Sequence, residues 1–257
     1  MKLQAGNQTF EIQAVAFDKD GLLFNSQYFW LELARVRAEA MAQHLSPEQV
    51  LAWLRFLGVQ AHLQGEEYII TQVDDLGIMA IAACWEEITA TAGFLVEHAS
   101  MGWVQARQVS VEVIGRADQV LDLTRALKPK PGFPQIFQRL RQAGIPYGIA
   151  TADPAQRALE SVDLFDDAKA LSFLITPEDV SVGKPEPEML HTISRRLGIP
   201  TEKILMVGDS YVDVLMARRA GAIGIGIGIP EHASMVPKME PYAHAILSSL
   251  EELQFEI

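Results

Sequence analysis

Hydrophobic and polar positions follow two different patterns along this chain of 257 residues. Residues 9–18 read as a strand, because their Val-Ala-Phe run is typical of a buried parallel strand and a turn sequence follows it. Farther along, apolar residues recur at three- and four-residue spacing, which predicts amphipathic helices. These helices are expected at residues 26–43, 47–57, 66–98, 101–114 and 117–127.

After a linker rich in Lys and Pro at residues 128–132, short apolar runs alternate with amphipathic segments. Asp153 and Pro154 are expected to begin a short helix, with Asp153 as its N-cap. The remaining helices are expected at 133–143, 186–197 and 210–220, and the strands at 146–151, 172–175, 204–207 and 222–227, with a last short strand and helix within 243–254.

Alternation of strands and helices predicts an α/β fold, a doubly wound parallel sheet of the Rossmann-like type. Residues 1–24 and 129–257 would form this α/β core. Residues 25–128 would form an all-α helical cap domain, inserted directly after the first strand.

Composition narrows the range of functions. Hydrophobic residues make up 49% of the chain, which excludes a disordered protein, and the net charge is −12. An acidic chain argues against nucleic acid or an anionic membrane as a partner. Cys84 is the only cysteine and no apolar stretch reaches the ~18 residues of a membrane span, so we expect a cytoplasmic protein. These features leave the oligomeric state open.

Chemically active side chains follow several of the predicted strands. Because ligands of such sheets bind outside the carboxyl ends of the strands, we expect these side chains to meet at one edge. The spacing of Asp209 and Asp213 places both on one face of a first helical turn. The residues concerned are Asp18, Asp20, Thr151, Lys184, Asp209 and Asp213.

A cluster of carboxylates requires a cation. Two unit charges 4 Å apart repel by about 4 kcal/mol at an effective dielectric constant of 20. Mg²⁺ is the natural solution, since it prefers oxygen ligands and pairs with phosphates. Lys184 and Thr151 suit phosphoryl oxygens, and the backbone amides after Asp18, which begin at Lys19, can form an anion-binding nest.

Four segments together resemble the motifs of the haloacid dehalogenase superfamily. They are residues 17–23 (FDKDGLL), the strand that ends in Thr151, residues 183–187 (GKPEP) and residues 207–213 (VGDSYVD), in the family's order. A helical cap between the first two motifs resembles the phosphoglycolate-phosphatase-like branch. The chain departs mildly from the family pattern at Leu22, where many members have Thr, and at Ala152, where a small polar residue is common.

This resemblance implies a Mg²⁺-dependent phosphatase that acts on a small phosphorylated metabolite through an aspartyl phosphate. Asp18 would be the nucleophile and Asp20 the general acid and base, with Thr151 and Lys184 completing the catalytic group. The cap would close over the site. The implied metal residues are Asp18, Asp20 (through its backbone carbonyl), Asp209 and Asp213, and the implied substrate-binding residues are Lys19, Thr151, Ala152 and Lys184.

Two other functions fit parts of this pattern. A phosphomutase of the same fold, similar to β-phosphoglucomutase, would carry identical core motifs. A receiver-like domain, phosphorylated on Asp as a non-enzymatic switch, shares the doubly wound sheet and an acidic pocket with Thr and Lys. Receiver-like domains lack a helical insertion of about 100 residues and the segment Gly-Asp-Ser-x-x-Asp.

Overall fold

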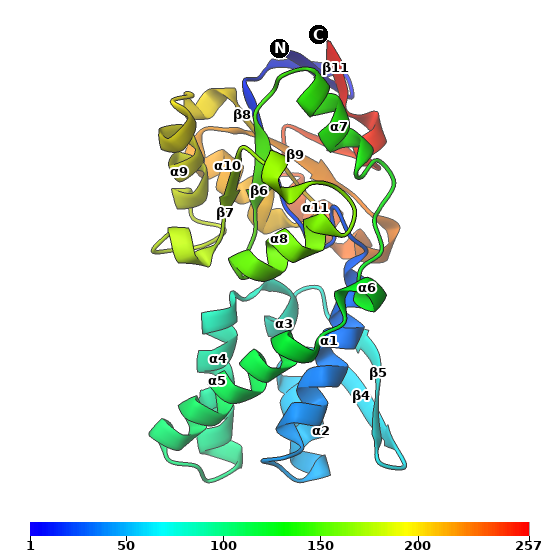
Figure 1. The fold of residues 1–257 in the computed structure, drawn as a ribbon, viewed down its shortest axis with the longest axis vertical. Coiled ribbons are helices and arrows are strands. Elements are labelled where there is room, and N and C mark those ends of the chain that lie inside the picture. The colour runs from blue at the N-terminus through cyan, green and yellow to red at the C-terminus, as the bar shows by residue number, and fades with distance from the viewer. Residues whose placement is uncertain (257) are drawn as a thin grey trace. The chain divides into compact units, whose positions relative to one another are not determined.

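A six-stranded parallel sheet lies at the centre of the larger of two units of the chain (Figure 1). The computed structural model describes residues 1–256. One unit comprises Met1–Asn25 and Pro129–Ile257, and the other, Ser26–Lys128, is inserted between these two segments. In the described part of the chain, no helix combines the length and apolarity that crossing a membrane requires.

The sheet confirms the predicted doubly wound α/β fold. Its strand order is β10-β9-β8-β3-β6-β7, and all neighbours are parallel. The register pairs Phe17 of β3 with Ile149 of β6 and with Val207 of β8, so these three strands end level with one another. The strands are β3 (Ala14–Phe17), β6 (Tyr147–Ala150), β7 (Phe173–Ile175), β8 (Ile204–Gly208), β9 (Ile223–Ile227) and β10 (Ala245–Leu247).

The first predicted strand is two strands in the structure. β2 (Gln8–Glu11) pairs with β1 (Lys2–Ala5), which also pairs with β11 (Gln254–Glu256), in a separate antiparallel sheet. The chain then enters β3 after the exposed Gln13. A single strand over 9–18 was therefore wrong, because mostly exposed polar residues of β2 belong to an edge sheet and only the continuously buried run belongs to the core.

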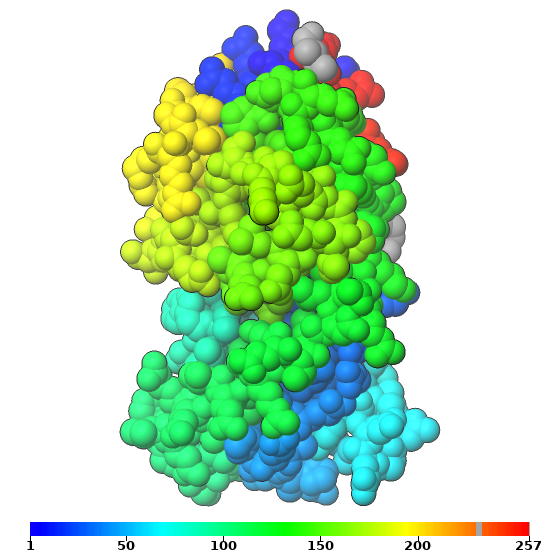
Figure 2. Space-filling model, viewed as in Figure 1, coloured from blue at the N-terminus to red at the C-terminus, as the bar shows by residue number. Residues whose placement is uncertain are grey.

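Helices cover both faces of the parallel sheet. Because side chains alternate along a strand, Ala14 and Ala16 face a cluster with α9 and α10, whereas Phe17 packs against Phe137 of α7. In the space-filling view, α8 and the segment after it (yellow-green) lie on the face toward the viewer (Figure 2). The helices of this unit are α7 (Gln135–Gln142), α8 (Ala155–Asp163), α9 (Glu188–Leu197), α10 (Tyr211–Ala220) and α11 (Val236–Met239).

The inserted unit is mainly helical, but it also contains a β-hairpin. Strands β4 (Val59–Gln64) and β5 (Glu67–Val73) pair in antiparallel fashion around Gly65. The all-α prediction was therefore wrong here, as was a helix over 66–98. The sequence of β5, Glu-Tyr-Ile-Ile-Thr-Gln-Val, is rich in β-branched and aromatic residues, and this is the signal that the helical interpretation overlooked.

Helices of the inserted unit enclose a core of their own. The indole of the fully buried Trp53 donates a hydrogen bond to the Thr91 hydroxyl at 3.2 Å. A buried ion pair joins Arg37 to Glu87, with nitrogen–oxygen distances of 2.6 and 2.7 Å. The helices are α1 (Ser26–Met41), α2 (Pro47–Phe56), α3 (Ile78–Ile81), α4 (Cys84–His98), α5 (Trp103–Val120) and α6 (Leu123–Ala126).

Candidate active site

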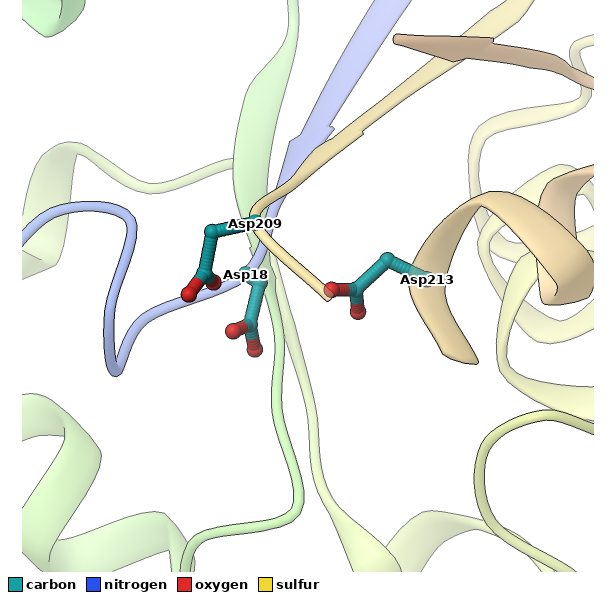
Figure 3. Close-up of side chains that lie close together, drawn as sticks. All are labelled: Asp18, Asp209 and Asp213. Atoms are coloured by element: carbon teal, nitrogen blue, oxygen red, sulfur yellow. The ribbon is translucent and has the colours of Figure 1, made fainter. Parts of the chain in front are cut away.

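Three carboxylates meet at the carboxyl edge of the parallel sheet. Asp18 directly follows β3, Asp209 directly follows β8, and Asp213 lies in the first turn of α10. One oxygen of each side chain lies within 4.8 Å of the others. Asp209 and Asp213 are buried, and the Asp18 side chain is 13% exposed. Figure 3 shows the three side chains extending from these elements toward one region. Their approach follows from the sheet order, because β3 and β8 are neighbours whose ends are level.

Lys184 joins two of these carboxylates. Its ammonium nitrogen lies 2.7 Å from an Asp18 oxygen and 2.6 Å from an Asp213 oxygen. Burial by itself would lower the pKa of Lys184, but the two carboxylates outweigh it and raise that pKa. The lysine is therefore a fixed positive charge beside the Asp18 carboxylate.

Two glycines leave room for the carboxylates. Gly21 has φ of +85°, and a Cβ there would lie 2.0 Å from an Asp209 oxygen. A Cβ on Gly208 would lie 2.3 Å from the Asp213 side chain. Any larger residue at either position would occupy space that a carboxylate already fills.

The Asp20 carboxylate lies outside this trio and binds Lys19 instead. The Lys19 nitrogen lies 2.6 Å from an Asp20 oxygen and 3.0 Å from an Asp153 oxygen, and the Lys19 side chain is 0% exposed. The sequence indicated Lys19 only as the start of a run of backbone amides. The structure shows that its side chain also contributes to the site region.

Asp153 is the residue of this region that the sequence interpretation missed. It was expected to cap α8, but the N-cap of that helix is Pro154 and no side chain caps it. The Asp153 carboxylate instead accepts hydrogen bonds from two nitrogens of Arg157, from Nη2 and, at 2.8 Å, from Nε. The four-residue spacing of Asp153 and Arg157 was the available signal, since such pairs meet on one face of a helix.

Thr151 and Ala152 lie at the end of β6. Thr151 is buried, and its hydroxyl oxygen accepts a hydrogen bond from the Asp153 backbone N–H at 3.1 Å. Ala152 is partly exposed. The β6 end therefore supplies one hydroxyl, whose own proton is a donor for an anion, beside the acidic edge.

Burial shifts the titration of these carboxyl groups. It is the largest influence on Asp18 and raises the pKa of that group to about 6, against the opposing charge of Lys184. Burial likewise raises the pKa of Asp20 to about 6, against the opposing charge of Lys19. For Asp153, the charges of Lys19 and Arg157 outweigh burial and lower the pKa to about 2.

The network contains both carboxylates and cations. The carboxylate oxygens of Asp18, Asp209 and Asp213 lie within 4.8 Å of one another, and such a set of oxygen donors fits a divalent cation. The carboxylates are Asp18, Asp20, Asp153, Asp209 and Asp213, and the cations are Lys19, Lys184 and Arg157.

The match to a family model decides the class of the protein. The model for haloacid dehalogenase-like hydrolases matches residues 12–221, which include the motif segments and the inserted unit. The chain belongs to the haloacid dehalogenase-like hydrolases. This confirms the resemblance that the motifs carry and the prediction of an enzyme.

Relatives extend the likeness over most of the chain. A phosphoglycolate phosphatase of Shigella dysenteriae is 26% identical over 235 residues, which cover 86% of this chain and 83% of the relative. A solved structure described as a predicted phosphoglycolate phosphatase from Haemophilus somnus superimposes with a TM-score of 0.65 at 16% identity, covering 93% of this chain and 95% of its own. The solved structure of a β-phosphoglucomutase from Clostridium difficile superimposes with a TM-score of 0.60 at 14% identity. The match covers 95% of this chain and 94% of that structure's chain. Both structures show the shared fold.

Proposed function

We propose that this hydrolase is a Mg²⁺-dependent phosphatase that acts on a small phosphorylated metabolite. The observation that carries the proposal is the edge at which Asp18 stands 2.7 Å from Lys184 and within 4.8 Å of Asp209 and Asp213. The arrangement pairs a nucleophile whose side chain is 13% exposed with a fixed positive charge and oxygen ligands for a cation. The phosphatase relatives support the same conclusion.

Asp18 is the proposed nucleophile. One of its carboxylate oxygens attacks phosphorus, the bond between phosphorus and the ester oxygen breaks, and the leaving oxygen takes a proton from the Asp20 carboxyl group. Water then attacks phosphorus, the bond to Asp18 breaks, and the Asp20 carboxylate accepts the proton of the water. The products are an alcohol and inorganic phosphate, and Asp18 and Asp20 are both regenerated.

The surrounding residues hold the phosphoryl group and its charge. Lys184 offsets the negative charge on Asp18 and on the phosphoryl oxygens, and the Thr151 hydroxyl donates to one of them. The backbone amides of Lys19 and Ala152 are further proposed donors. In phosphoryl transfer most of the rate gain comes from such positioning and electrostatic stabilisation, because the protein performs little covalent chemistry.

The proposed direct ligands of Mg²⁺ are Asp18, the backbone carbonyl of Asp20 and Asp209. Asp213 is proposed to act beside them by orienting water bound to the ion or by orienting Lys184. When bound, the ion would withdraw negative charge from the phosphoryl group. A set made only of oxygen donors favours Mg²⁺ over softer transition metals. A cytoplasmic location stays a prediction.

Phosphate release from a panel of phosphorylated metabolites and 4-nitrophenyl phosphate tests the proposal. We expect turnover that EDTA abolishes and Mg²⁺ restores, and that Asp18→Asn abolishes. Arg141→Gln, which removes only an exposed ion pair with Asp166, serves as the control and is expected to retain wild-type turnover. A wild-type protein that releases no phosphate, or an Asp18→Asn variant that matches it, would contradict the proposal.

A phosphomutase would use the same Asp18 chemistry but return the phosphoryl group to a sugar. The same assay separates the two functions, because a mutase converts a sugar phosphate to its isomer without releasing phosphate. A receiver-like switch is disfavoured, since the chain belongs to a family of hydrolases.

A further inference from the structure

The Lys19 ammonium group connects two strand ends of the site. It lies 2.6 Å from the carboxylate of Asp20, in the loop after β3, and 3.0 Å from that of Asp153, in the loop after β6. Asp153 is held in turn by Arg157 and donates its backbone N–H to the Thr151 hydroxyl. A continuous polar chain therefore runs from the proposed acid and base to the proposed phosphate-binding threonine.

Stability alone does not account for a lysine at this position. The side chain is 0% exposed, and removing an ammonium group from water costs several kcal/mol, so that apolar residues in place of a whole buried cluster of charges are often as stable. The Phe24 ring, whose centroid lies 5.8 Å from the Lys19 nitrogen, offers an apolar neighbour for such residues. What an apolar residue cannot do is bind two carboxylates at once.

We propose that Lys19 and Asp153 are positioning residues that hold the Asp20 carboxylate in the orientation needed for proton transfer. Lys19 fixes one Asp20 oxygen, and Asp153, clamped by Arg157, fixes the Lys19 ammonium group. This proposal rests on the proposed function, because it assigns these residues to the same hydrolysis.

The two chemical steps depend differently on Asp20, and this difference supplies the test. Cleavage of 4-nitrophenyl phosphate needs little acid assistance, because nitrophenolate is a stable leaving group. Cleavage of an alkyl phosphate needs the Asp20 proton. Breakdown of the aspartyl phosphate needs Asp20 as a base for either substrate.

The experiment uses the full chain carrying Lys19→Met, which preserves length and removes the charge. With 4-nitrophenyl phosphate, rapid mixing is expected to show a burst of about one equivalent of nitrophenolate, followed by slow turnover. With the best alkyl phosphate of the panel, we expect kcat to fall by about a hundredfold with little change in KM and no burst. Asp153→Asn should shift both readouts in the same direction by a smaller factor, and it is the second variant should Lys19→Met fail to fold.

Arg37→Met is the matched control, because Arg37 is an equally buried cation paired with Glu87 in the inserted unit. It should lower the melting temperature without producing a burst. If Lys19→Met and Asp153→Asn lose only stability, or slow both substrates equally with no burst, the positioning role is refuted while the phosphatase function stands. If the wild-type protein hydrolyses no phosphate ester, the proposed function itself has failed.

Discussion

Gly21→Ala adds a single methyl group at the point where the loop after β3 meets the Asp209 carboxylate. The new Cβ would lie 2.0 Å from one Asp209 oxygen and 2.7 Å from its carboxyl carbon. Both distances are far below van der Waals contact, so the carboxylate or the loop must move by more than about 1 Å. Asp209 is buried, which leaves its carboxylate little space in which to rotate.

Two separate effects follow from this substitution. Gly21 has φ of +85°, and placing a Cβ residue in a left-handed conformation costs about 1–2 kcal/mol of stability. Displacing Asp209 by about 1 Å is expected to cost about a hundredfold in kcat, because catalytic geometry tolerates little error. We also expect the Mg²⁺ concentration needed for half-maximal activity to rise.

Gly144→Ala separates the two effects. Gly144 also has positive φ, at +66°, but nothing lies within 4 Å of a Cβ built there. Gly144→Ala should therefore lose only the stability that its positive φ costs, whereas Gly21→Ala should lose at least as much in urea unfolding. Only Gly21→Ala should lose activity in a Mg²⁺ titration of phosphate release. A Gly21→Ala enzyme with wild-type kcat and Mg²⁺ dependence would refute the placement of Asp209 at the site.

Three further outcomes follow from the structure. Lys184→Met should lower kcat by about a hundredfold or more at saturating Mg²⁺, because it removes the positive charge beside Asp18, and a normal rate would contradict its electrostatic role. Asp153 has its pKa lowered to about 2 in the folded state, so its ionisation should contribute about 2 kcal/mol of stability above pH ~5 that is lost as the pH falls toward 2. In denaturant unfolding, the difference in the free energy of unfolding between wild type and Asp153→Asn should therefore shrink as the pH falls. A difference that stays constant would contradict a stabilising role of the ionised Asp153 carboxylate. Glu87→Gln should lower the free energy of unfolding of its unit by about 3 kcal/mol, because the buried Arg37 loses the carboxylate 2.6 Å away and keeps Asp118 at 4.0 Å. Replacing both Arg37 and Glu87 by Met should recover most of that loss, and equal losses would show that charge is not the cause.

The core fold was predictable from the sequence because its strands are marked locally. Each strand buried on both faces must be a continuous apolar run, and each is followed by a polar turn and an amphipathic helix. The hairpin at β4 and β5 was harder to predict. Its strands are half-exposed and lie between helices, so the surrounding helical periodicity outweighed a local β signal of only seven residues in β5.

The sequence also determined which chemical groups the strand ends carry, since those residues follow the apolar runs directly. It could not determine which charges pair. Asp153 was expected at a helix cap, yet the structure places it between Lys19 and Arg157.

Only the tertiary structure decided these partners, because they depend on the order and register of the strands. Lys184 reaches Asp18 from 166 residues away, and Lys19 reaches Asp153 because β6 lies beside β3 with level ends. The local pattern of apolar and polar residues indicates burial and periodicity only within one helix or strand. The distance between two charges belongs to the packing of several elements, and that distance is what sets the pKa values and the electrostatics of the site.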